Sequence, residues 1–244
     1  MNVPVSAPVS DRGLLARTIG MVTAPTDTFR AVVSSPRPFG VLLLACVVLV
    51  LATAGPQFTA RGRQAALDMQ VQQVEKFTRQ PVAPQAYAQM ERQAERFGPY
   101  FAAIGTFVFV PVMSLFFTAL YWVAFNTILG GTAAFKQVLG IVAHGQVITA
   151  LGAAVTAPIQ YASGVNTPTG PFNLGALAPM LDPNSFLATF LGMLTVFQIW
   201  AVVVTAIGLA VLYNRTRRNV TIALLAFHGL VMAGFAAVPA LFFR

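Results

Sequence analysis

Three polar side chains inside long apolar runs are the residues of this chain best placed to do chemistry. Asn126, His144 and His228 each lie in a stretch that is otherwise almost wholly apolar. An imidazole exchanges a proton near neutral pH, ligates metals, and donates or accepts hydrogen bonds. A polar or ionisable group in apolar surroundings is costly to keep and therefore points to a role.

The three polar residues are predicted to lie in the same half of a bilayer if their runs cross one. With the N-terminus inside, Asn126 falls near the inner end of the second run. His144 lies about 12 Å from the inner start of the third run, and His228 lies at a similar depth in the fifth. Three roles are possible. The residues could form a shared polar pocket or a pH-responsive histidine pair, or they could bind a metal, although two histidines are few for a metal site. The simplest interpretation is that they form hydrogen bonds between helices.

Sequence signatures of catalysis are absent. The chain contains no HExxH, no GxSxG and no Walker A lysine loop. None of its seven acidic residues falls in the core of an apolar run, so an intramembrane carboxylate mechanism lacks its residues. The single cysteine, Cys46, excludes an intramolecular disulfide and a cysteine metal cluster. We expect a protein that is not an enzyme and holds no cofactor and no metal.

Small residues recur at every fourth position along two of the apolar runs. This spacing places them on one face of a helix, where they allow two helix backbones to approach closely. The face is expected to pack either inside one bundle or between subunits of a homo-oligomer. The residues are Gly145, Thr149, Ala153 and Ala157 in one run, and Gly229, Ala233 and Ala237 in the other.

The elements that must position these residues are membrane-spanning helices. Apolar residues make up 57% of the 244 residues and charged residues 9%, whereas a soluble domain carries roughly 25% charged residues. About 20 apolar residues span a bilayer core. We therefore predict an all-α integral membrane protein with five transmembrane helices. The five predicted segments are 39–58, 100–129, 135–161, 184–213 and 220–243.

Two regions are expected in the chain, a cytoplasmic tail with interfacial helices at 1–38 and a five-helix membrane domain at 39–243. Residues 13–34 are too polar to span a bilayer, but four of their apolar side chains fit one helical face. Such a helix lies on the membrane surface. The four residues are Leu14, Leu15, Ile19 and Val22.

The placement of basic residues orients the predicted bundle and argues against nucleic-acid binding. The net charge is +8, but the basic residues form no contiguous patch with interleaved aromatic residues. With the N-terminus inside, eight basic residues fall inside and seven outside, so the raw count discriminates poorly. The short turn with Arg215, Arg217 and Arg218 favours that orientation, because the irregular outer loop at 163–184 holds no basic residue. We expect the N-terminus in the cytoplasm.

The long loop at 59–99 is predicted to form a helical hairpin outside the membrane. Its two halves show amphipathic helical spacing, and Pro81 and Pro84 separate them. The hairpin either packs on itself as a solvated element or docks a partner outside the membrane. The candidate docking residues are Leu67, Val71 and Val74 in the first half, and Tyr87, Met90 and Phe97 in the second.

The order of these features resembles the Yip (Ypt-interacting protein) family of five-span membrane proteins, in its bacterial form. The stretch APTDTFRAVVSSP is similar to the family's entry into its first span, and GGTAAFKQVLGIVAHGQVITAL to its third. The fourth predicted span carries Phe197, Trp200 and Gly208, which match a Phe-x-x-Trp pattern and a following glycine. The resemblance covers most of residues 20–243.

The resemblance implies a cytoplasmic N-terminus, five helices and one of two kinds of partner. Eukaryotic members bind Rab-type GTPases in vesicle traffic. Some bacterial members resemble accessory subunits of MacAB-like ABC exporters with periplasmic adaptors. The short N-terminal region departs from the eukaryotic pattern, and the 59–99 hairpin suits an extracytoplasmic adaptor.

Three functions are therefore carried forward. The first is a non-enzymatic scaffold or accessory subunit of a transport or export assembly in a bacterial cytoplasmic (inner) membrane. Its partners would be the lipid bilayer and a membrane or periplasmic protein, or further copies of itself. The second is a stand-alone channel or transporter, which would have to work without intramembrane carboxylates. The third is a GTPase-linked trafficking adaptor, if the source is eukaryotic.

Overall fold

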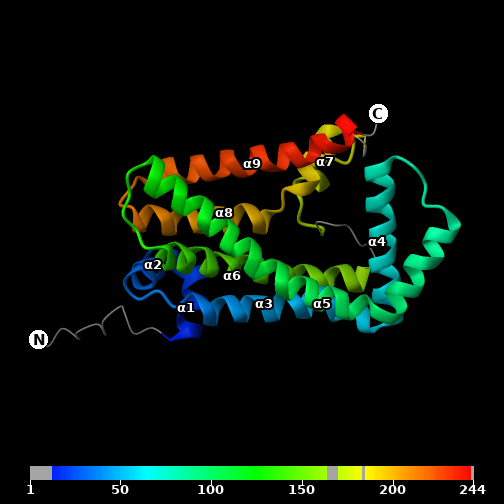
Figure 1. The fold of residues 1–244 in the computed structure, drawn as a ribbon, viewed down its shortest axis with the longest axis horizontal. Helices are drawn as coiled ribbons and strands as arrows, with labels where there is room; N and C mark the ends of the chain where they lie inside the picture. The colour runs from blue at the N-terminus through cyan, green and yellow to red at the C-terminus, as the bar shows by residue number, and fades with distance from the viewer. Residues whose placement is uncertain (1–12, 164–169, 183–184, 243–244) are drawn as a thin grey trace, which may run out of the picture. The chain divides into compact units, whose positions relative to one another are not determined.

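The computed structural model describes residues 13–163, 170–182 and 185–242. Every named element in these ranges is helical (Figure 1). The α-helices and one π-helix (η3) are α1 (Leu14–Thr23), α2 (Pro25–Ser34), α3 (Pro38–Ala54), α4 (Ala60–Thr78), α5 (Pro84–Trp122), η3 (Val123–Ile128), α6 (Phe135–Ser163), α7 (Phe186–Met193), α8 (Val196–Leu212) and α9 (Arg217–Phe242). Two short 3₁₀ helices are η2 (Pro56–Phe58) and η4 (Leu174–Leu177).

Four helical segments of the described chain are long and apolar enough to cross a membrane. They correspond to α3 with η2, α5 with η3, α6, and most of α9. The apolar composition is thus organised into spanning helices, and the prediction of an all-α membrane protein is confirmed at that level. The fourth predicted span is not among the four, since α8 has 17 residues.

The prediction of one continuous helix over 184–213 is wrong. The chain forms α7, leaves helical geometry at Leu194 and Thr195, and resumes as α8. Backbone groups of a distant segment pair with the interruption, because Leu174 N–H donates to Leu194 O at 2.8 Å and Val196 N–H donates to Phe172 O at 2.9 Å. Long-range pairing therefore replaces the helical hydrogen bonds that the break removes.

The boundary predicted between the 59–99 hairpin and the second span is also absent. The hairpin's second arm and the span form one helix, α5, of 39 residues. The first arm is α4, which begins at a Thr59 cap whose side chain accepts from Gly62 N–H. It ends at Arg79 with a left-handed backbone (φ 56°).

The described chain divides into two compact units. The described residues of the first lie within Met1–Cys46, Phe109–Thr149 and Trp200–Leu225. Its core is apolar and gathers side chains of α2, α3, α6 and α8, including Phe29, Val41, Ile141 and Leu209. The apolar window of α6 is 67% buried, against 11% for that of α5. Helix α6 is therefore the most enclosed of the four long apolar segments.

The second unit comprises Val47–Val108, Ala150–Ile199 and Ala226–Arg244. It contains the α4–α5 hairpin, seen in Figure 1 as two arms joined by a turn. At the base of the hairpin, Arg61 lies over the Tyr161 ring at 5.4 Å and donates to Ala162 O at 3.3 Å. These contacts attach the start of α4 to the end of α6.

Candidate functional site

Asn126 secures the turn between η3 and α6. Its Nδ2 donates to Ala133 O at 2.7 Å, and its Oδ1 accepts from Ala133 N–H at 3.2 Å. Trp122 Nε1 donates to the same carbonyl at 2.9 Å. Both polar atoms of the Asn126 amide therefore form hydrogen bonds with the backbone of the turn, where a helix end leaves backbone groups without helical partners.

The local bonding of Asn126 predicts a structural effect of its removal. Asn126→Ala should lower the free energy of unfolding by about 1–3 kcal/mol, because it leaves the partly buried Ala133 N–H without its acceptor. Thr127→Ala, an exposed change in the same turn, should stay within about 0.5 kcal/mol of wild type. Unfolding by SDS in mixed micelles, followed by circular dichroism, measures both. Equal stabilities of the two variants would contradict this role.

His144 lies on α6 and is fully buried in the first unit. Its Nδ1 bonds Gly140 O at 2.7 Å, so Nδ1 carries the proton of that bond. Its Nε2 is buried without a hydrogen-bond partner in the described part of the chain.

His228 lies on α9 in the second unit, and its Nε2 is also buried without a partner among the described residues. The structure thus places Asn126 and His144 in one unit and His228 in the other. Across the described residues, no group of three or more His, Cys, Asp or Glu is arranged to hold a metal ion. A polar pocket shared by the three residues stays a prediction.

A buried polar seam joins α5 to α6, and sequence reasoning missed most of it. Ser114 and Thr118 are fully buried. Thr118 Oγ1 donates to Ser114 O at 2.6 Å, and Gln146 Nε2 donates to Ser114 Oγ at 3.2 Å. The available signal was the i, i+4 spacing of two hydroxyl residues on an apolar helix. Such bonds hold helices together in a membrane.

The small residues lie in different surroundings. A Cβ at Gly145 would collide with Thr205 Oγ1 of α8, so the two backbones come close there. Thr149 is exposed, while Ala153 and Ala157 are half-buried. On α9, Ala233 is half-buried and no atom lies within 4 Å of a Cβ built at Gly229. Packing through these two stripes remains a prediction.

Helix α1 buries a charge and exposes its apolar face. Arg17 is only 2% exposed and donates from Nη1 to Ser35 O, at the end of α2, at 2.9 Å. A cation at a helix C-terminus is favoured by the helix dipole. Leu15 and Ile19, by contrast, are 71% and 63% exposed. Composition alone did not single out Arg17, because burial of an arginine depends on tertiary packing.

The candidate docking residues of the hairpin divide into inward and outward side chains. Leu67 is buried, and Tyr87 OH accepts a hydrogen bond from Gln64 Nε2 at 3.3 Å across the two arms. Val71 and Met90 are half-buried, whereas Val74 and Phe97 are exposed. Several of the predicted docking residues therefore help the arms pack on each other.

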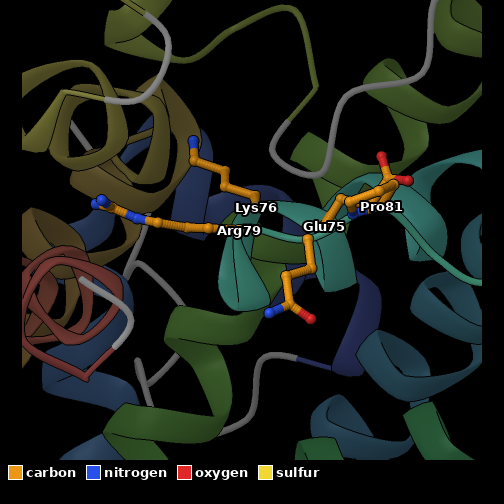
Figure 2. A pocket seen from close by; sticks show the side chains of 5 residues that line it. Glu75, Lys76, Arg79 and Pro81 are labelled. Atoms are coloured by element: carbon orange, nitrogen blue, oxygen red, sulfur yellow. The ribbon is translucent and has the colours of Figure 1, made fainter.

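The hairpin tip (residues 74–82) presents two cations beside apolar side chains. Lys76 and Arg79 are exposed and point to the same side of α4 (Figure 2). With Glu75, Gln80 and Pro81 they line an open hollow. The Glu75 carboxylate is hydrogen-bonded within the turn, since its Oε1 accepts from Val82 N–H at 3.0 Å. The tip therefore combines positive charge with the exposed Val74 and Phe77.

Comparisons with known proteins agree with the helical membrane architecture. The Yip1 domain family matches residues 19–238. Membrane protein YknW of Bacillus subtilis (strain 168) is 24% identical over 193 residues, which cover 78% of this chain and 75% of YknW. No solved structure matches the chain. Because the family match covers nearly the whole described bundle, from α1 to α9, the chain belongs to the Yip1 domain family of membrane proteins.

Proposed function

We propose that this protein is a non-enzymatic accessory subunit or scaffold of a transport or export assembly, and that its hairpin tip binds an extracytoplasmic protein partner. The observation that carries the proposal is the helix α5. Its 39 residues have a contour length of about 58 Å, whereas a bilayer core is about 30 Å thick. The polar first part of α5, with α4 beside it, therefore stands clear of the membrane.

The chemistry of the tip defines the partner. Lys76 and Arg79 supply two exposed positive charges, while the acidic neighbour Glu75 is bonded to the backbone of the turn. Exposed Val74 and Phe77 add apolar surface. A complementary partner carries an apolar patch rimmed by carboxylates, the arrangement found in specific protein interfaces. The proposed assembly is a MacAB-like ABC exporter with its adaptor.

The proposed topology has five crossings with the N-terminus in the cytoplasm. Helix α8, with 17 residues, rises about 26 Å, which is the lower limit for a span. Helix α7 supplies the remaining apolar length at one end. Five crossings place the hairpin outside and the Arg215–Arg218 turn inside a bacterial inner membrane. The exposed face of α1, with Leu15 and Ile19, then lies on the cytoplasmic surface as an interfacial helix.

Labelling of introduced cysteines tests this topology. In a Cys46→Ala background, Gln80→Cys at the hairpin tip should react with a membrane-impermeant maleimide in intact cells. Thr216→Cys, in the arginine turn, should react only after permeabilisation. Both side chains are exposed, so reactivity reports the side of the membrane. Reaction of both sites in intact cells would refute the five-span arrangement, and the reverse pattern would refute the cytoplasmic N-terminus.

A stand-alone channel or transporter is the second candidate, and the break between α7 and α8 favours it. Interrupted helices commonly bind substrates or ions in transporters. Here, however, Leu194 O and Val196 N–H are paired with residues 172–174, which leaves less backbone for a substrate. Solute movement by the purified protein alone in liposomes would establish this alternative. The similarity to bacterial YknW favours both candidates over a Rab-type adaptor.

A further inference from the structure

Large apolar side chains are unusually exposed in the segment between α6 and α8. Met180 is 80% exposed and Leu177 is 78% exposed, the highest values among the large apolar residues that the structure describes. Phe186 and Leu187 of α7 are each 47% exposed. An irregular loop in water does not normally gather such residues, since exposed apolar patches mark contact surfaces.

Charge is almost absent from this part of the chain. Between Lys136 and Arg215 the sequence contains one charged residue, Asp182. The hairpin at 59–99, which belongs to the same unit, is rich in charge by comparison, because it contains ten basic and acidic residues. The two connections therefore suit different surroundings, one aqueous and one apolar.

The irregular backbone of the segment pairs with itself. Asn173 and Thr195 form an antiparallel bridge, flanked by the two hydrogen bonds that close the break before α8. Asn173 Oδ1 accepts from Ala176 N–H at 3.0 Å, and Ser185 Oγ accepts from Ala188 N–H at 3.2 Å. Non-helical backbone near lipid requires such internal satisfaction, because lipid offers no replacement hydrogen bonds.

The length of α7 decides how the segment meets the membrane. Its eight residues, Phe186–Met193, rise only about 12 Å and cannot cross a bilayer. Phe186 and Phe190 stack on one side of this helix with ring centroids 6.1 Å apart. A short apolar helix that continues through a paired break into α8 fits the boundary between headgroups and acyl chains.

We propose that residues 170–182 and 185–196, the surface segment, are embedded in the lipid surface rather than exposed to water. Met180 and Leu177 insert among the upper acyl chains of the leaflet at the α7 end of α8. The paired backbone of Phe172–Leu174 and Leu194–Val196 remains shielded from solvent. This inference stands independently of the partner proposed for the hairpin.

Depth-dependent quenching tests the proposal on the full chain in liposomes. Met180→Cys and Leu177→Cys, each in a Cys46→Ala background, are labelled with an environment-sensitive fluorophore. Gln80→Cys at the hairpin tip is the matched control, since its side chain is also exposed. The quenchers are iodide in water and a nitroxide attached near the top of a lipid acyl chain.

The labels at positions 177 and 180 should show blue-shifted emission, quenching by the lipid nitroxide and loss of iodide quenching. The label at position 80 should show the opposite pattern. Strong iodide quenching at 177 and 180 would place the segment in water and overturn the proposal. Protection from both quenchers would mean that protein, such as a second copy, covers the segment, and would overturn it equally. A Leu187→Cys label on α7 provides an independent repeat.

Discussion

Gly208→Leu is expected to destabilise the first unit by about 1–3 kcal/mol or more, through overpacking. A Cβ at Gly208 would lie 2.5 Å from Ile141 Cγ2 of α6 and 2.9 Å from Phe29 Cδ1 of α2. Both neighbours belong to the buried core, so neither is free to move aside. The added side chain would have to separate α8 from α2 and α6.

The matched control for Gly208 is Gly234→Leu on α9. No described atom lies within 4 Å of a Cβ built at Gly234. Leucine there should be neutral or should stabilise the helix by up to about 1 kcal/mol, because glycine is a poor helix former. SDS unfolding in mixed micelles compares the two variants. If both variants unfold at the wild-type SDS fraction, the close approach at Gly208 does not stabilise the fold.

Charge reversal at the hairpin tip has the second large expected effect. The Lys76→Glu, Arg79→Glu double variant should reduce recovery of the extracytoplasmic partner about tenfold or more. Two attractive contacts become repulsive, and about 1.4 kcal/mol corresponds to a factor of ten. The fold should be unaffected, because both side chains are exposed.

The control for the tip is a double variant of equal charge change on the α5 arm, Arg92→Glu with Arg96→Glu. Both side chains are exposed, and the Arg96 guanidinium lies over the neighbouring Phe97 ring, 4.9 Å from its centroid. Gentle detergent purification and quantification of the partner per copy of this chain compare the variants. Equal losses in the two double variants would point to the net charge of the hairpin rather than to its tip.

The long apolar helices were predictable because their composition leaves no other stable arrangement. A run such as 135–161 must form a helix in lipid, where every backbone group needs an internal partner. The second predicted span ends at 129, and the structure ends η3 at Ile128, just before the glycine pair Gly130–Gly131. Gly208 was noted in the sequence only as a match to a family pattern, and the close approach of α2 and α6 gives the physical reason for a glycine there.

The break before α8 was not predictable from local sequence. Leu194 and Thr195 lie in a run that supports a helix, and the partners that stabilise the break are twenty or more positions earlier, at Phe172 and Leu174. The sequence also did not show that the second arm of the hairpin and the second span form one helix. The predicted hairpin ended at residue 99 and the predicted span began at residue 100, yet α5 continues through both positions.

The candidate polar residues show what depth arguments leave out. A rise per residue placed Asn126 and His144 in the same half of the bilayer, but it says nothing about the direction of their side chains. Asn126 bonds the Ala133 backbone, and His144 bonds Gly140 of its own helix. The burial of Arg17 follows from the packing of α1 against the end of α2, which no periodicity in the sequence indicated.

Site-specific photo-crosslinking in living cells tests the central claim, that the hairpin tip binds a protein partner, most directly. A photoreactive amino acid replaces Val74 at the tip, and Val112 of α5, also exposed, serves as the control. We predict one discrete adduct at Val74 with a protein other than this chain, absent at Val112 and lost with Lys76→Glu, Arg79→Glu. No adduct at Val74, or an adduct with a second copy alone, would contradict the proposed function.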